Sequence, residues 1–146
     1  MGSVFNHDII NNWLALTHIQ MNVANELEAS LQEKHDLSLK EFYLLLFLSE
    51  APEKKLKLQN LESMVGLSQS AVSRLVSRFE AKGCGALQRH ACDNDRRSIY
   101  TSLTEIGQNK LDHALITFNE RLLTTFPEKK VEQLLRQMVR FKEETS

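Results

Sequence analysis

The sequence predicts a mainly α-helical fold with a small β-hairpin. Apolar residues recur at three- and four-residue steps over most of the chain, which is typical of amphipathic helices. Within residues 58–83 two short helical patterns meet at a glycine, and residues 87–103 alternate between apolar and polar around a polar loop. Two short helices followed at once by a hairpin indicate a winged helix-turn-helix, here flanked by long helices.

Composition and charge indicate one globular domain with a basic region that favours a polyanionic partner. The chain has 146 residues, of which 42% are hydrophobic and 25% charged, enough to bury a core of its own. The formal net charge is only −1, but residues 54–100 carry nine Lys or Arg against four Asp or Glu, and the rest carries nine against fifteen. A basic middle between acidic ends favours a polyanionic partner.

The first part of the chain is expected to form two helices. Residues from about 9 to 32 keep a helical apolar period. Ser38 with Glu41 three residues later is a capping box, which starts a second helix that stops before Pro52. Apolar residues surround this second helix on most sides, so we expect it to be central and buried. A lysine-rich loop, "PEKKLK", follows.

The helix-turn-helix is expected within residues 58–83. A short helix from about Gln59 to Val65 ends at Gly66, where the chain can turn through positive φ. Ser68 caps the next helix, which reaches about Lys82 before Gly83. The apolar residues at helical spacing hold the two helices together: Leu58, Leu61, Val65, Leu67, Val72, Leu75, Val76 and Phe79.

The outer face of the second of these helices is small, polar and cationic. Small residues allow the backbone to approach a phosphate, and Gln or Arg side chains can reach base edges, so this is a candidate recognition helix for a major groove. A merely solvated amphipathic helix is the alternative, which the following hairpin disfavours. The candidate DNA-binding residues are Ser68, Gln69, Ser70, Ser73, Arg74, Ser77 and Arg78.

The hairpin is expected to act as a wing. Its strands are predicted at residues 87–91 and 98–103 around the loop "CDND", with Ile99, Thr101 and Leu103 pointing inward. Arg96 and Arg97 stand where the loop meets the second strand, in position for a neighbouring minor groove, whose negative potential favours arginine.

Three more residues of the hairpin complete the candidate wing site. Asp95 is expected to hold one of the adjacent guanidinium groups by an ion pair while the other points at DNA. Arg89 and His90 on the first strand are candidate phosphate contacts.

The C-terminal part is expected to form two more helices, the first capped by Thr104 and the second beginning at Pro127 and Glu128. Their apolar residues exceed what a thin arm can bury alone, so we expect a second copy of the chain to cover them. These residues are Ile106, Leu111, Leu115, Phe118, Leu122, Leu123, Phe126, Val131, Leu134, Leu135, Met138 and Phe141.

The segments "LSLKEFYLLLFL", "LESMVGLSQSAVSRLVSRFEAKG" and "DNDRRSIYTSLTEIGQ" resemble, in order and spacing, the MarR (multiple-antibiotic-resistance regulator) family of bacterial winged-helix regulators. The resemblance implies one MarR-like domain over residues 1–146, with a winged helix-turn-helix at about 38–104 and dimerisation helices at about 5–34 and 105–145. It implies a homodimer on a pseudopalindromic operator, with half-site centres about 34–36 Å apart.

The resemblance also implies an effector pocket between the dimer helices and the winged domain. Trp13, His18, Phe42 and Phe47 are candidates for its lining, with ordinary core packing as the alternative. Two departures concern the DNA-binding part. Glu62 stands where such motifs carry a small residue, and "GCGALQRH" is two residues longer than expected, which places the insertion in the turn between Gly83 and Gly85.

The remaining chemistry-bearing residues predict neither an enzyme nor a cofactor. There is no phosphate-binding glycine loop, no His-Glu-x-x-His and no recognisable nucleophile set. Cys84 and Cys92 are either ordinary reduced thiols or a redox-responsive pair. Of His7, His18 and His35, which are scattered, only His35 has two acidic residues close by, Glu33 and Asp36, so we expect no metal site.

We therefore expect a sequence-specific regulator that binds double-stranded DNA, a homodimeric repressor released by a small ligand or by thiol oxidation. A winged-helix module that binds protein is the alternative; it would need an apolar or acidic outer face on the recognition helix. The longest apolar run, Tyr43 to Leu48, is too short to cross a bilayer and no signal-peptide pattern opens the chain, so we expect a cytoplasmic protein with no membrane partner.

Overall fold

The computed structural model describes residues 7–81, 83–92, 95–125 and 129–145, without the side chains of 91–92, 95–98, 129–132, 134, 141 and 145. The expected fold class, mainly α-helical with a small sheet, is confirmed. The elements in chain order are α1 (His7–His35), α2 (Leu39–Glu50), the 3-10 turn η1 (Pro52–Lys54), β1 (Lys55–Lys57), α3 (Leu58–Val65), α4 (Gln69–Ala81), β2 (Leu87–Cys92), β3 (Asp95–Leu103), α5 (Glu105–Thr125) and α6 (Lys129–Thr145).

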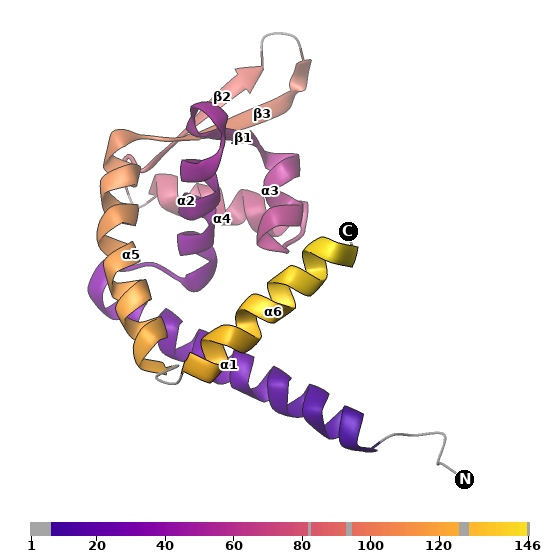
Figure 1. Ribbon diagram of the computed structural model, residues 1–146. Helices are drawn as coiled ribbons and strands as arrows, with labels where there is room; N and C mark the ends of the chain where they lie inside the picture. Colours follow the sequence, from indigo (N-terminus) through magenta and orange to yellow (C-terminus); the bar gives the residue numbers. More distant parts are fainter. Residues whose placement is uncertain (1–6, 82, 93–94, 126–128, 146) are drawn as a thin grey trace.

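The two ends of the molecule have different architectures. Figure 1 shows the hairpin of β2 and β3 projecting at one end, and α1 and α6 at the opposite end, with α5 running along one side between them. The helices α2, α3 and α4 gather under the sheet. None of the described helices is long and apolar enough to cross a membrane.

The sheet has three strands in the order β1-β3-β2, where the sequence had predicted a hairpin alone. The expected lysine-rich loop contains β1, which pairs antiparallel with β3 through Lys55 to Ser102 and Lys57 to Tyr100. A three-residue Lys-Leu-Lys segment has no strand pattern of its own. It becomes a strand because β3 supplies the hydrogen-bonding partner from more than 40 positions along the chain.

The hairpin is longer than expected, since β2 extends to Cys92 and β3 begins at Asp95. Its register shifts between Ala91, which pairs with Ile99, and Cys92, which pairs with Asp95. Thr101 and Leu103 are buried, as predicted, but Ile99 is 36% exposed. The prediction for Ile99 is wrong because the outer half of the hairpin extends past the helices, so an inward-facing position has nothing to pack on.

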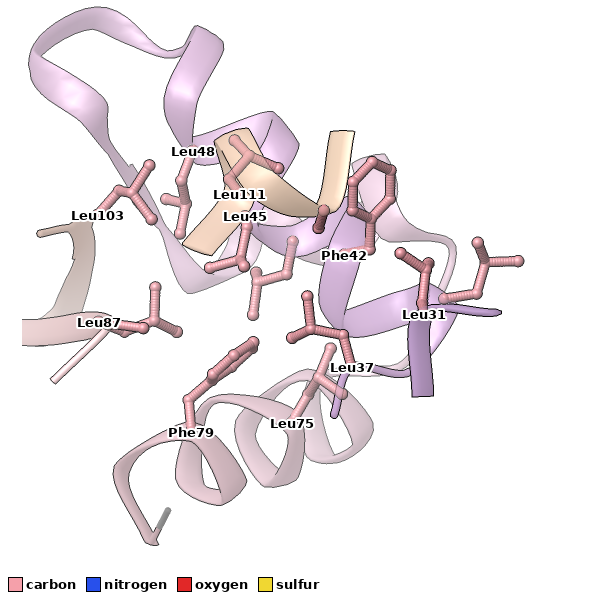
Figure 2. Close-up of a cluster of buried hydrophobic side chains, with 14 of the residues drawn as sticks. Leu31, Leu37, Phe42, Leu45, Leu48, Leu75, Phe79, Leu87, Leu103 and Leu111 are labelled. Carbon is pink, nitrogen blue, oxygen red and sulfur yellow. The ribbon is translucent and has the colours of Figure 1, made fainter. Parts of the chain in front are cut away.

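The core forms around α2, as predicted. Phe42, Leu45 and Leu48 are fully buried, and they meet Leu75 and Phe79 from α4 and Leu111 from α5 (Figure 2). The ring of Phe42 stacks on that of Phe118, with centroids 4.6 Å apart. The close-up also shows Leu87 and Leu103 beside Leu45 and Leu48, so the base of the hairpin belongs to the same core.

Local signals at the helix ends also behave as predicted. The Ser38 hydroxyl accepts a hydrogen bond from the Glu41 N–H at 3.1 Å, and the Glu41 carboxylate accepts one from the Ser38 N–H at 2.8 Å. Gly66 ends α3 in the left-handed region at φ 75°, where a side chain would be strained. These caps fix where α2 begins and where the chain turns toward α4.

The start of α5 is attached to the base of the hairpin. The Thr104 hydroxyl donates to the Ala86 carbonyl at 3.0 Å and accepts from the Gly107 N–H at 3.1 Å, which is the predicted cap. A Cβ on Gly107 would overlap the Ala86 carbonyl oxygen. Farther along, α5 packs against α1, so one helix connects the sheet to the opposite end of the molecule.

Candidate nucleic-acid interface

The candidate interface begins with the first turn of α4. The Ser68 hydroxyl accepts from the Ala71 N–H at 3.3 Å, and the Ser68 carbonyl accepts from the Val72 N–H at 2.9 Å. The hydroxyl of Ser70 lies 3.3 Å from that of Ser68. Small side chains at this turn leave the positive end of the helix dipole accessible to an anion.

The two faces of α4 have opposite character. Val72, Leu75, Val76 and Phe79 form its buried face, each at most 1% exposed. The predicted recognition residues share the other side: all are exposed except Ser73, which is half-buried. They are Ser68, Gln69, Ser70, Ser73, Arg74, Ser77 and Arg78.

A hollow of about 560 Å³ runs along the exposed side of α4. It is lined by two alanines and a serine, which keep the surface close to the helix backbone, and by the guanidinium groups of Arg74 and Arg78. The Nε of Arg74 donates to the Ser70 carbonyl at 3.3 Å, which lays the side chain along the helix. No carboxylate is among these lining residues, so the hollow suits an anion.

Arg89 of β2 does not extend freely from the hairpin. Its Nε lies 2.7 Å from a carboxylate oxygen of Glu80, and its Nη2 donates to the Ser77 hydroxyl at 2.9 Å and to the Ser73 carbonyl at 3.3 Å. The sequence pattern predicted that Arg89 contacts phosphate and did not indicate Glu80 as its partner. Only the packing of β2 beside α4 brings the two together.

His90, the next residue on β2, is exposed. Its Nε2 lies 2.9 Å from the Ser102 hydroxyl across the hairpin. This hydrogen bond leaves the other ring nitrogen available, so a phosphate contact by His90 stays a prediction.

Asp95, Arg96 and Arg97 are the first three residues of β3. Arg96 and Arg97 fall between the two register pairs that flank the shift, so they lie in the irregular stretch of the hairpin. Their side chains lie outside the described residues, and so does the predicted ion pair of Asp95. Their role in a minor groove stays a prediction.

The two cysteines occupy opposite ends of β2. Cys84 is half-buried before the strand, with its thiol 3.9 Å from the Phe79 carbonyl. Cys92 ends the strand, and its side chain lies outside the described residues. Five residue steps of strand rise about 3.3 Å each, so an intrachain disulfide would require the hairpin to unpair.

His35 lies at the junction of two helices. Its Nε2 is 2.7 Å from the Thr117 hydroxyl, and its carbonyl accepts from the Lys110 Nζ at 3.0 Å. Burial is the main cause that lowers the pKa of His35 below its ordinary value. The positive charges of Lys110, His113 and Lys34 lower this pKa further. Among the described residues no three metal-ligating side chains come together.

The candidates for an effector pocket are not brought together. Phe42 is a fully buried core residue, whereas Trp13 is 66% exposed and His18 is exposed on α1. Phe47 is half-buried, with its ring 6.5 Å from that of Tyr43. Within the described chain these four side chains do not form one lining.

Lys40 is a second residue that sequence analysis missed. From the first turn of α2 its Nζ donates to the Val65 carbonyl at 3.0 Å. Val65 is the last residue of α3, so an ammonium group satisfies the end of that helix just before the turn into α4. No local pattern reveals such a cap, because it comes from another helix.

These features define a winged helix-turn-helix: α3 and α4 joined by a glycine turn, a three-stranded sheet with a projecting hairpin, and long flanking helices. The model of the MarR family matches residues 35–98, which contain this unit. The resemblance found in the sequence is thus confirmed over residues 35–98, which are similar to this family. No curated protein matches the chain by sequence.

Solved structures share the fold over nearly the whole chain. The MarR family regulator Sco3205 from Streptomyces coelicolor, in complex with DNA, has a TM-score of 0.84 at 20% identity, over 99% of this chain and 91% of its own. BldR from Sulfolobus solfataricus has a TM-score of 0.80 at 21% identity, over 99% of each chain. A mutant MarR from E. coli complexed with operator DNA has a TM-score of 0.73 at 18% identity, over 94% of this chain and 99% of its own.

Proposed function

We propose that the chain is a homodimeric, sequence-specific transcriptional regulator that binds double-stranded DNA in the cytoplasm. It acts as a repressor, and a small ligand or thiol oxidation releases it from its operator. The observation that carries the proposal is the outer side of α4, where small residues and two arginines surround a hollow with no carboxylate among its described lining residues.

In this proposal α4 lies in a major groove and the hairpin reaches the adjacent minor groove. The described part of α4 supplies Arg74 and Arg78 toward base edges and small residues toward the backbone. The structural likeness to regulators solved in complex with DNA supports DNA binding by this fold. The DNA-binding part corresponds to about residues 38–104.

The proposed dimer forms through the flanking helices, about residues 5–34 and 105–145. Large apolar side chains are exposed along all three: Ile9, Trp13, Leu14, Ile19 and Met21 on α1, Ile116 and Leu123 on α5, and Leu135, Met138 and Val139 on α6. Every described side chain of α6 is exposed. A second copy that covers these residues removes a large apolar area from water, which favours association.

The docking is tested at Arg74. Duplexes selected from a random pool would supply the operator, and binding is then measured for Arg74→Ala and for Arg140→Ala, which removes an equal charge from α6. We expect Arg74→Ala to cost about 1–3 kcal/mol and to relax the preference at one position in each half-site. Arg140→Ala should change neither.

The wing is tested by salt dependence. Arg96→Ala or Arg97→Ala, whichever removes the guanidinium group that points at DNA, should weaken binding to all duplexes alike and reduce the salt slope by about one, because it removes a phosphate contact. Unchanged operator affinity in all three variants, at positions 74, 96 and 97, would refute the proposed docking.

A further inference from the structure

The side chain of Arg89 links the hairpin to the recognition helix. From β2 it contacts Ser73, Ser77 and Glu80, which lie one helical turn apart along a single stripe of α4. The planar guanidinium group points Nε toward Glu80 and Nη2 toward the two serines. The edge that carries these two nitrogens is therefore occupied by contacts spaced along the helix axis.

We propose that Arg89 is a positioning residue that holds the hairpin at a fixed angle to α4, with Glu80 as its counter-charge. It is therefore not a phosphate ligand, the role that its residue type and strand position first indicated. The inference rests on the proposed function, because its consequence is the simultaneous placement of α4 and the hairpin on one duplex.

The connection between α4 and β2 explains why a side-chain link is needed. Gly83 and Gly85 both have positive φ, at 64° and 71°, in the short segment between the two elements. Thr104 and Gly107 hold the base of the hairpin against α5 through Ala86. Arg89 is three residues farther toward the tip, so among the described contacts it is the one that ties the strand to the recognition helix beyond the base.

The charge of Glu80 separates the two roles of Arg89. If Arg89 were a phosphate ligand, Glu80 would compete with DNA for it and would repel phosphate, so Glu80→Gln would tighten operator binding. If Arg89 positions the hairpin, Glu80→Gln removes its counter-charge and weakens binding. The ion pair is part-exposed, at 29% for the Arg89 side chain and 43% for that of Glu80, so the effect is modest.

The test is a double-mutant cycle on operator affinity. We expect Glu80→Gln, Arg89→Gln and the double variant each to weaken binding by the same factor, about two- to fivefold, as for a part-exposed pair. Glu62→Gln on α3 removes a carboxylate without touching Arg89, so it measures the general effect of one less negative charge. The salt slope should stay at the wild-type value in Arg89→Gln, because no phosphate contact is lost.

Two results would overturn the assignment. One is tighter binding by Glu80→Gln than by Glu62→Gln. The other is a salt slope that falls by about 0.9 in Arg89→Gln, the signature of a lost phosphate contact.

A measurement on the free protein keeps this inference separate from the proposed function. Arg89→Gln and Glu80→Gln should both speed amide hydrogen exchange at residues 88–90 of β2, while exchange in α2 stays unchanged. Unaltered exchange in β2 would also refute the positioning role. If the wild-type chain binds no duplex, the proposed function fails, and the exchange rates alone decide the role of Arg89.

Discussion

Gly107 shows how one residue determines the junction between two elements. It lies in the first turn of α5, and a Cβ there would overlap both the Ala86 carbonyl oxygen and the Leu103 side chain. Alanine is ordinarily the better residue inside a helix, by about 1 kcal/mol over glycine. The close approach to Ala86 therefore reverses an intrinsic preference.

We expect Gly107→Ala to lower the free energy of unfolding by about 1–3 kcal/mol, the usual cost of overpacking. Urea denaturation followed by circular dichroism measures it. Asn109→Ala, at an exposed position of the same helix, should be neutral or slightly stabilising. A Gly107→Ala variant as stable as wild type would show that α5 can shift away from Ala86 without loss.

Residue-scale chemistry was predicted well where it is local and poorly where it is not. The exposed set on α4 follows from helical spacing alone, because the apolar residues fix which face is buried. The partners of Arg89 do not follow from it, since they depend on how β2 lies beside α4. Ile99 failed for a related reason: strand alternation says which face a residue takes, but not whether the body extends beneath it.

At the scale of elements, the junction of α1 with α5 is sensitive to protons. His35 ends α1 and meets Thr117 of α5, and burial, together with the nearby charges of Lys110, His113 and Lys34, disfavours its charged form. Its pKa is thus lower in the folded than in the unfolded chain. The unfolded state then binds more protons as the pH falls, so stability declines.

The resulting loss begins as the pH falls through the ordinary imidazole value of about 6.5 and is complete below the folded pKa. We expect the free energy of unfolding to fall less between about pH 7.5 and pH 5.5 in His35→Gln than in wild type. His7→Gln, at the exposed start of α1, should behave as wild type. Equal losses in His35→Gln and wild type would contradict the assignment.

Most elements were predictable because their ends carry local signals. The capping box at Ser38, the left-handed Gly66 and the cap at Thr104 all lie where sequence analysis placed them. β1 was missed because three residues, two of them lysine, form a strand only through pairing with β3. A short lysine-rich edge strand also resists pairing with other chains, which protects the sheet from aggregation.

For the whole molecule, the exposed apolar residues of α1, α5 and α6 predict the oligomeric state. Leu123 of α5 is 68% exposed, so Leu123→Glu should leave the fold of the protomer intact. We expect the wild type to sediment as a dimer. The Leu123→Glu dimer should dissociate at protein concentrations at which the wild type is still dimeric. Met64→Glu, which changes an exposed apolar residue on α3 outside the flanking helices, is the matched control.

Analytical ultracentrifugation over a dilution series measures this difference. The melting temperature should also rise with protein concentration in the wild type, because association favours the folded state by mass action. A monomeric wild type at every concentration would refute the proposed dimer and, with it, the reading of two half-sites by one particle.

Because α5 is attached at both ends, a rotation at one end displaces the other. Its 21 residues span about 31 Å. One end is held to the base of the hairpin by Thr104 and Gly107, and its body packs against α1. A rotation of only about 5° at the α1 end would displace the hairpin end by about 3 Å over such a length. A wing bound in a minor groove would move with that end of the helix. In the proposed dimer, a change at the far end of the molecule would therefore also change the distance between the two DNA-binding units.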